Sequence, residues 1–229
     1  MSAMDLEQLG WELLTHGGLL LDPKRLRELA EDAPAPLPTH VADELRRRHV
    51  AFVEDRSRAG DFVGWVLERV CGFAPGTGTW QRGSQIGTEW SHTSLTGEVV
   101  RPRHLWRGNP AGLLPVFIDT EHEAIGKGRG KKAVSNVLHW MRTSGHRLAL
   151  LTNGRQWRLL YAGLDAEAWC EWDSERWLEE GGLGRQVHAL RLLLHPDRWK
   201  VVEKDQPSAL PRAIQDSRKG QAELSALLG

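Results

Sequence analysis

The sequence predicts an α/β protein of the α+β type, with a mixed sheet between two helical segments. Three observations predict this class. Roughly the first 70 residues carry apolar side chains at helical spacing, the middle of the chain alternates short β-prone runs with one amphipathic stretch, and the last part returns to helical spacing. The order of helices, strand, strand, helix, hairpin and helices is typical of a core built around a mixed sheet.

The first segment, residues 1–73, is predicted to be a helical flank. Apolar residues at helical spacing indicate helices over 5–17, 22–33 and 38–73. Asp22 has a side chain suited to capping the second helix, and Pro23 fits the first helical position, where no N–H is needed. The Pro-rich residues 33–38 indicate a short rigid connector.

Residues 74–165 are predicted to form the sheet core. Strand candidates lie at 85–90, 99–106 and 114–119, and a helix is expected over 131–145. Asn153 and Gly154 separate two β-prone runs within 147–163, and their tolerance of positive φ predicts a type I′ hairpin turn. The Gly-rich stretch 74–85 lacks a phosphate-binding fingerprint, so it is either a connector or a loop over DNA with Trp80 and Arg82 at its tip.

Residues 166–229 are predicted to be a helical C-terminal extension. Asp173 is placed to cap a helix over 173–181, and helical spacing of apolar residues continues over 184–199. Residues 221–229 read as the beginning of a helix that continues. We therefore expect a further domain downstream of this chain.

Charge is balanced over the whole chain but not along it. Thirty Lys and Arg residues equal thirty Asp and Glu residues, whereas residues 101–160 hold eleven basic and three acidic residues. This local excess suits an anionic partner such as nucleic acid, although a solvated helix face would produce the same count. The two cysteines are far apart, which argues against a disulfide framework or a zinc site. No apolar run reaches the ~18 residues of a membrane span, so we expect a cytoplasmic protein without a membrane partner.

An acidic strand end lies within the basic region. The apolar run that begins at Leu114 ends in Asp119 and Glu121, and a Gly-rich basic loop then leads to Lys131 and Lys132. Residues at i and i+2 of a strand share a face, so Asp119 and Glu121 are placed to hold one Mg²⁺ ion. Lys131 or Lys132 would then hold the phosphate during metal-assisted phosphodiester hydrolysis. The alternative is a solvated strand end followed by a solvated turn.

Four motifs between residues 100 and 161 carry a resemblance to a known family. They are RPRHLW at 101–106, VFIDTE at 116–121, the helical residues Asn136 and Trp140, and the hairpin LLTNGRQWRLLY at 150–161. Together they resemble the nuclease domain at the amino terminus of large restriction-modification proteins, the single-chain type IIG and type I-like systems. That domain belongs to the PD-(D/E)XK superfamily, so the resemblance implies a restriction-endonuclease-like core between the helical flank and the C-terminal helices.

The resemblance is closest at the hairpin and weakest at the active-site motif. The family places Pro-Asp on one strand, Glu-x-Lys on the next, Gln-x-x-x-Tyr on a helix and Thr-Asn-Gly on a further strand. Here Arg103 stands in the Asp position, Asp119 in the Glu position and Glu121 in the Lys position, and Asn136 and Trp140 replace Gln and Tyr. An arginine at the first ligand position repels a metal cation, which argues against Mg²⁺ binding by the usual trio.

The resemblance implies one of two functions, and the sequence leaves both open. In the first, the chain is the DNA-acting domain of a bacterial restriction-modification or phage-defence protein, a Mg²⁺-dependent endonuclease of the type II-like restriction class. Asp119 and Glu121 then hold the metal, Lys131 or Lys132 assists at the phosphate, and Glu68 is a third acid. In the second, an inactive relative binds double-stranded DNA or docks a partner protein. Both imply methyltransferase and specificity domains, or subunits, as partners.

Six arginines are predicted to contact DNA phosphates: Arg101, Arg103, Arg107, Arg129, Arg155 and Arg158. Five such contacts would make the affinity fall with salt at a log–log slope of roughly −4 to −5. His104 lies next to Arg103 and is predicted to approach Asp119. A third interpretation, a small helical interaction domain with an incidental hairpin, requires that residues 98–161 do not form one continuous sheet.

Overall fold

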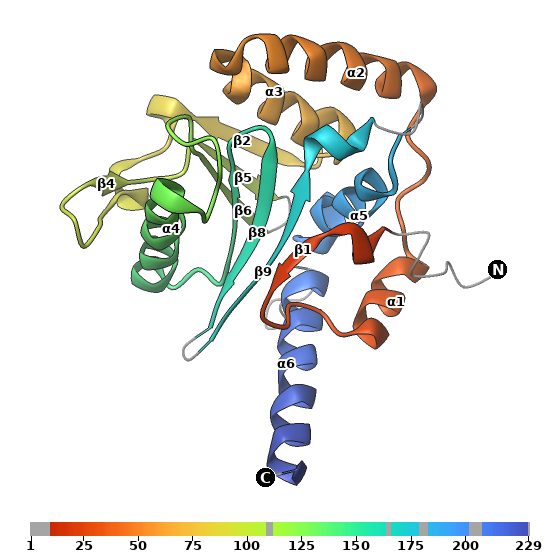
Figure 1. Cartoon of the computed structure of the whole chain (residues 1–229), viewed down its shortest axis with the longest axis vertical. Coiled ribbons are helices and arrows are strands. Elements are labelled where there is room, and N and C mark those ends of the chain that lie inside the picture. The colour runs from red at the N-terminus through yellow and green to blue at the C-terminus, as the bar shows by residue number, and fades with distance from the viewer. Residues whose placement is uncertain (1–9, 109–111, 164–165, 179–182, 202–207, 229) are drawn as a thin grey trace.

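The computed structural model describes residues 10–108, 112–163, 166–178, 183–201 and 208–228. The strands of its main sheet are β1 (Thr15–Gly17), β2 (Gly78–Arg82), β5 (His104–Gly108), β6 (Leu113–Ile118), β7 (Leu148–Thr152), β8 (Gln156–Ala162) and β9 (Glu167–Asp173). They lie in the order β1-β9-β8-β7-β6-β5-β2 (Figure 1). A separate two-stranded hairpin consists of β3 (His92–Thr93) and β4 (Val99–Val100).

The centre of the sheet combines antiparallel and parallel pairing. Strands β2, β5 and β6 form an antiparallel meander, and β7 lies parallel to β6. Because parallel neighbours need a crossover connection, the chain passes from β6 to β7 through helix α4 (Lys131–Ser144). Strand β8 then pairs antiparallel with both β7 and β9. The predicted mixed α/β class is confirmed. The predicted strand 99–106 is divided, because β4 pairs with β3 in the separate hairpin while β5 joins the main sheet, so residues 98–161 do not form one sheet throughout, although β5, β6, β7 and β8 are continuous neighbours.

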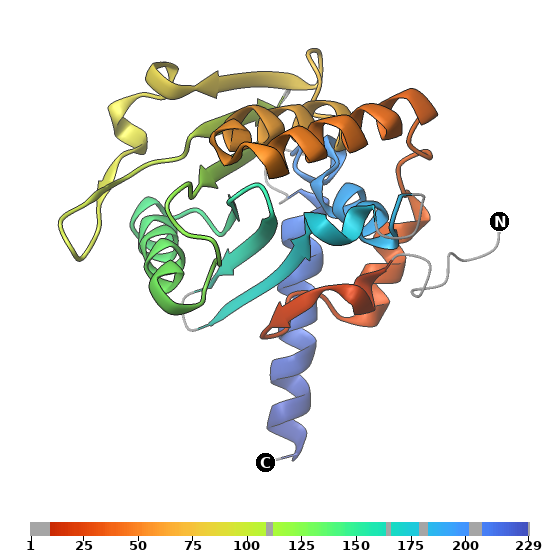
Figure 2. The same ribbon diagram turned by 45° about the horizontal axis from the view of Figure 1, so that its top comes forward.

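Two hydrophobic layers cover the two faces of this sheet. Side chains alternate along β7, so Ala149 and Leu151 pack toward α4 whereas Leu148 and Leu150 join the larger cluster on the other face. That larger cluster is covered by α2 (Thr39–Glu54), α3 (Ala59–Trp65) and α5 (Arg185–Leu194), as Figures 1 and 2 show.

The remaining helices frame the large cluster. They are α1 (Pro23–Glu31), a π-helical turn that continues α3 over Val66–Val70, and α6 (Ala209–Leu228). The Asp22 carboxylate accepts a hydrogen bond from the Arg25 backbone N–H at 2.9 Å, which confirms the predicted cap. The C-terminal part of α6 extends away from the sheet (Figures 1 and 2).

The predictions for the chain before residue 100 were partly wrong. The described part of the first predicted helix contains a 3₁₀ turn and strand β1, which pairs with β9. The stretch expected to be a connector contains β2, whereas the expected strand 85–90 contains the end of one 3₁₀ turn, two linking residues and a second 3₁₀ turn. Strand β2 forms because Trp80 packs on Phe73 and donates its indole N–H to the Phe73 carbonyl at 3.0 Å, a tertiary contact that the local pattern does not reveal.

The prediction of an all-helical C-terminal segment was also wrong. Strand β9 pairs along its whole length with β8, and its residues Ala168, Cys170 and Trp172 are buried. Asp173 does cap a helical turn, but that turn is a 3₁₀ helix over Ser174–Trp177. Residues 179–182 of the predicted helix lie outside the described part of the chain.

All three predicted segments contribute to one core. Strand β1 comes from the helical flank, β9 comes from the C-terminal segment, and the larger hydrophobic cluster takes residues from all three. Among the residues that the structure describes, no helix combines the length and the apolar character needed to span a bilayer.

Candidate functional site

A cleft of about 260 Å³ opens where β6 ends, between α4 and the β3–β4 hairpin. Its walls include two arginines on the β5 side, the acids that follow β6, and the first turns of α4. The charged residues that line it are Glu98, Arg101, Arg103, Asp119, Glu121 and Lys132. The structure thus places Asp119, Glu121, Lys132, Arg101 and Arg103 from the predicted site around one cavity.

Asp119 is held by its own loop. Its side chain is only 7% exposed, and Oδ1 accepts a hydrogen bond from the Glu121 backbone N–H at 3.0 Å. The Nδ1 atom of His122 lies 2.9 Å from Oδ2 and 3.1 Å from Oδ1. The Asp119 backbone N–H also donates to the Thr152 carbonyl, which extends the β6–β7 pairing by one residue. Both carboxylate oxygens therefore already have partners.

His122 is a site residue that the sequence analysis missed. It lines this cleft and a second hollow of about 430 Å³ on the other side of the acidic loop. Its Nδ1 faces the Asp119 carboxylate, so Nε2 lies on the far side of the ring, where it has no hydrogen-bond partner in the described part of the chain. The Asp-x-x-His spacing directly after a buried strand is the signal that would have identified this pair.

The residues around Asp119 do not fit a Mg²⁺ site. This ion takes near-octahedral oxygen ligation from carboxylates and water. Asp119 would have to give up its contacts with His122 and the Glu121 amide, and Arg103 lines the same cleft with its positive charge. Within the described ranges, no group of three His, Cys, Asp or Glu side chains is placed to hold a metal ion.

The two candidate lysines differ in their surroundings. Lys132 lies 2.5 Å from the Glu98 carboxylate of the hairpin, and Asn136 donates to the same carboxylate at 3.1 Å. These two hydrogen bonds lower the pKa of Glu98, with Lys132 the larger cause. Lys131 is exposed at the start of α4 and makes no ion pair within the described residues. Lys132 therefore anchors the hairpin, and only Lys131 retains an uncompensated charge.

Glu68 and His104 lie away from Asp119. Glu68, on the π-helical turn, forms an ion pair with Arg82 and does not line either hollow beside Asp119. His104 pairs with Val116, three positions before Asp119, so alternation along the strand puts its side chain on the opposite face. Burial lowers the pKa of His104 to about 4, and its Nδ1 has no hydrogen-bond partner among the described residues. The predicted approach of His104 to Asp119 is therefore wrong.

The six predicted DNA-contacting arginines differ in their surroundings. Arg101 and Arg103 line the cleft, and neither makes a salt bridge within the described residues. Arg158 is buried and paired with Glu171 at 2.7 Å, so its charge is not offered to solvent. The other three are Arg107, hydrogen-bonded to Gln81 and stacked on Trp90, Arg129, exposed before α4, and Arg155, paired with Asp173 and Glu175.

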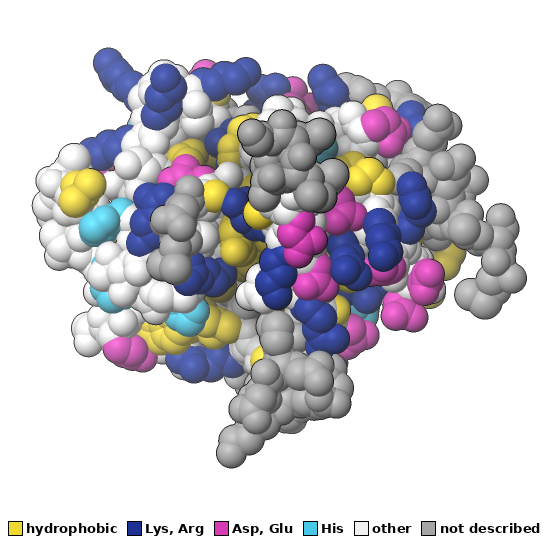
Figure 3. Space-filling model, turned by 90° about the horizontal axis from the view of Figure 1, so that it is seen from below, with side chains coloured by type: hydrophobic (Ala, Val, Ile, Leu, Met, Phe, Trp, Pro, Cys, Tyr) yellow, Lys and Arg dark blue, Asp and Glu magenta, His cyan; other side chains and the backbone are white. Residues whose placement is uncertain are grey.

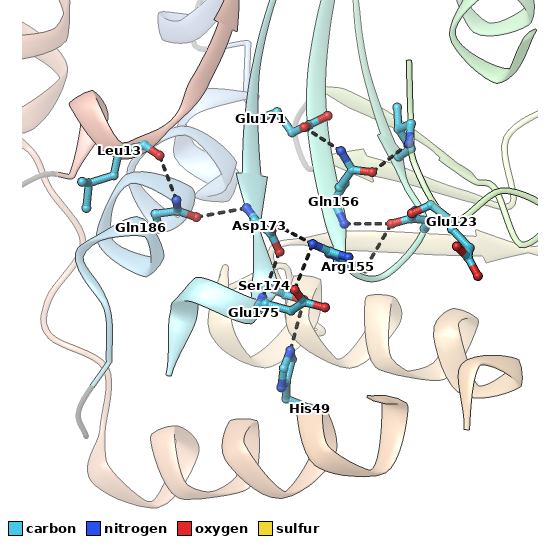
Figure 4. A network of polar contacts seen from close by, with 12 residues as sticks. Leu13, His49, Glu123, Arg155, Gln156, Glu171, Asp173, Ser174, Glu175 and Gln186 are labelled. Atoms are coloured by element: carbon cyan, nitrogen blue, oxygen red, sulfur yellow. Dashed lines mark hydrogen bonds and ion pairs between the residues drawn. The ribbon is translucent and has the colours of Figure 1, made fainter. Parts of the chain in front are cut away.

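Figure 4 shows the surroundings of Arg155, and Figure 3 shows how charge is distributed over one face of the molecule. In the close-up, Arg155 points between Asp173 and Glu175, and Ser174 beside them contacts His49 (Figure 4). On the face seen from below, basic side chains are interspersed with acidic ones (Figure 3). Uncompensated positive charge near the acids is thus concentrated at the cleft and at the start of α4.

The Thr-Asn-Gly turn holds the acidic loop in place. The buried amide of Asn153 donates to the His122 and Glu123 carbonyls at 3.2 and 3.1 Å. Its Oδ1 accepts from the backbone N–H groups of Arg155 and Gln156 at 3.1 and 2.7 Å. The predicted type I′ geometry was wrong, because only Gly154 has positive φ. Hydrogen bonding by the Asn153 side chain replaces the tighter turn and fixes the loop that carries His122.

Helix α4 also holds the β3–β4 hairpin. His139 lies 3.2 Å from the Thr93 carbonyl, and the Trp140 indole N–H donates to the Trp90 carbonyl at 2.8 Å. Together with Lys132 and Asn136 on Glu98, these contacts form a stripe along one side of α4. The helical positions at which the family has Gln and Tyr therefore position the hairpin here.

Comparison with known proteins adds no assignment. No family model, no curated protein and no solved structure matches this chain.

Proposed function

We propose that this chain is a restriction-endonuclease-like DNA-binding domain of a restriction-modification or phage-defence protein, and that it contacts a backbone phosphate without Mg²⁺. The order of β5, β6, α4 and β7 supports the proposal, because the resemblance implies two strands, a helix and a further strand in that order. Its Thr-Asn-Gly motif ends β7, as the resemblance also implies.

The observation that carries the proposal is the sharing of one cleft by Arg103 and Asp119. The Asp119 carboxylate is occupied by His122 and by a backbone amide, whereas the guanidinium of Arg103 has no salt-bridge partner within the described residues. A guanidinium binds a phosphate oxygen pair through parallel N–H donors. Arg103 is therefore available to bind an anion beside the exposed carboxylate of Glu121, and Arg101 lines the same cleft, where it is placed to add a second contact.

Titration of labelled duplex DNA by fluorescence anisotropy over a range of salt concentrations tests this proposal. Arg103→Ala should reduce the log–log salt slope by about 1 and weaken binding equally across DNA sequences, because a phosphate contact carries no base information. Arg69→Ala is the matched control, since Arg69 is also exposed but lies on the π-helical turn at the opposite face.

A plasmid cleavage assay separates the silent module from the nuclease. We expect no difference between Mg²⁺, Mn²⁺ and chelator, and no effect of Asp119→Ala on DNA binding. Nicking that requires metal and disappears in Asp119→Ala and Glu121→Ala would overturn the metal-free proposal. Equal slopes for wild type and Arg103→Ala would instead remove Arg103 from the DNA contact.

A further inference from the structure

The β3–β4 hairpin exposes two large apolar side chains. Leu95, in the turn, is 85% exposed, and Val99, at the start of β4, is 72% exposed. The hairpin stands beside α4 at the edge of the molecule (Figures 1 and 2). Exposure of apolar side chains to water is energetically unfavourable, so two of them on one projecting hairpin call for an explanation.

The hairpin is held rigidly from one side only. Ser94 accepts hydrogen bonds from the backbone N–H groups of Gly97 and Glu98, through its carbonyl and its hydroxyl respectively, which closes the turn. The stripe on α4 holds the strands, with Lys132 and Asn136 both on Glu98. Leu95 and Val99 are left pointing to solvent from a backbone that is already ordered.

The apolar pair lies next to the two cleft arginines, which have no salt-bridge partner among the described residues. From Val99 to Arg103 the chain alternates, with Val99, Arg101 and Arg103 exposed and Pro102 buried between them. Val99, Arg101 and Arg103 all line the cleft. One edge of the molecule thus presents apolar side chains followed directly by two guanidinium groups, and Lys132 compensates the charge of Glu98 beside them.

We infer that the β3–β4 hairpin inserts Leu95 and Val99 into the minor groove of duplex DNA while Arg101 and Arg103 hold the adjacent phosphates. This inference rests on the proposed function. Apolar side chains that enter the minor groove wedge between base steps and partly unstack them, and flanking arginines offset the phosphate charge. Clamping by α4 reduces the entropy that the hairpin loses on insertion.

Charge and size favour DNA over a partner protein. A protein interface buries on the order of 800 Å² on each side around an apolar core. Two apolar side chains cannot supply that core, and the two arginines beside them, which have no salt-bridge partner among the described residues, suit a polyanion even though Glu121 lines the same cleft. The same features are those of a groove wedge, in which a small apolar tip is guided by phosphate contacts.

The test is base unstacking measured with 2-aminopurine in duplex DNA, alongside anisotropy on the same duplex. Wild type should raise 2-aminopurine fluorescence on binding. Leu95→Ala with Val99→Ala should abolish that rise and weaken binding roughly tenfold, with the salt slope unchanged because no phosphate contact is lost. The matched control is Val50→Ala with Val53→Ala, two exposed valines on α2, which should behave as wild type.

The outcomes distinguish this inference from the proposed function. If the hairpin variant keeps wild-type affinity and fluorescence while Arg103→Ala reduces the salt slope, the domain binds DNA and the wedge is refuted. If no variant and no wild-type sample binds DNA, both are refuted. Circular dichroism and urea unfolding of each variant check that its fold is intact.

Discussion

Asn153 shows how one side chain positions a site built from other residues. Its amide and carbonyl join the hairpin turn to the loop after β6 through four hydrogen bonds. His122 and Asp119 are paired in that loop, so their geometry depends on a residue that touches neither carboxylate nor ring. Buried amides that satisfy several backbone groups stabilise a single loop conformation, because each lost partner leaves a desolvated polar group.

We predict that Asn153→Ala lowers the free energy of unfolding by about 2–3 kcal/mol, since it leaves several buried backbone groups without their hydrogen-bond partner at once. Asn153→Asp should also destabilise the fold, because Oδ1 still accepts from Arg155 and Gln156 but the second carboxylate oxygen would face the His122 and Glu123 carbonyls. Urea unfolding monitored by tryptophan fluorescence measures both. Equal stability of Asn153→Ala and wild type would contradict the positioning role.

Residue identity alone predicted which acids share a cleft but not what each contacts. Asp119 and Glu121 both line the cleft, but they lie in the loop after β6, so strand alternation is not what brings them together. Strand alternation could not show that the Asp119 carboxylate is paired with the His122 ring, or that Arg158 is buried and paired with Glu171. Those pairings depend on where β8, β9 and the loop meet in space.

At the scale of elements, local signals succeeded where they were dense. The hairpin around Asn153 and Gly154 combines turn chemistry with two apolar runs, and helix α4 combines helical spacing with Gly145 at its C-terminus. Strands β1, β2 and β9 were missed because β1 and β2 are short and lie at the sheet edges, and because helix-like acids follow β9. Their stability comes from neighbouring strands and core contacts, which no local window contains.

Gly154→Ala should destabilise the fold more than Gly145→Ala. Both glycines have positive φ, so both alanines incur a backbone penalty of roughly 1–2 kcal/mol. A methyl group at Gly154 would also meet the Phe52 ring at 2.6 Å, whereas the space around Gly145 is open. Thermal unfolding of the two variants measures the difference, which we expect to reach about 2 kcal/mol or more. If both variants lost the same free energy of unfolding, α2 could move away from the turn without an energetic penalty.

At the scale of the whole molecule, burial of histidines couples stability to pH. Burial lowers the pKa of His49, His104, His146, His188 and His195 below the ordinary value, to about 4 for His104. The unfolded chain therefore binds more protons than the folded chain between about pH 6.5 and 4. The contribution of these histidines to the free energy of unfolding should be fully present above pH 6.5 and should be lost as the pH drops toward 4.

The contribution of His104 to this dependence is testable with His104→Gln, which keeps a polar side chain but cannot gain a proton. From its shift we expect His104 to account for at most about 3 kcal/mol of the acid destabilisation. Urea unfolding of both proteins at several pH values from 7.5 to 4.5 should show a shallower decline for the variant. Parallel curves would show that His104 does not contribute.

The sequence by itself determined the mixed α/β class, the order of β6, α4, β7 and β8, the cap of α1 and the acids after β6, because each depends on periodicity or on contacts only a few residues apart. Only the tertiary structure decided that three segments share one sheet, that Asp119 is paired with His122, and that Arg101 and Arg103 have no salt-bridge partner among the described residues beside an exposed hairpin. These features arise between residues distant in the chain or turned toward one another by a loop, where packing and hydrogen-bond geometry choose among partners that the pattern leaves equivalent.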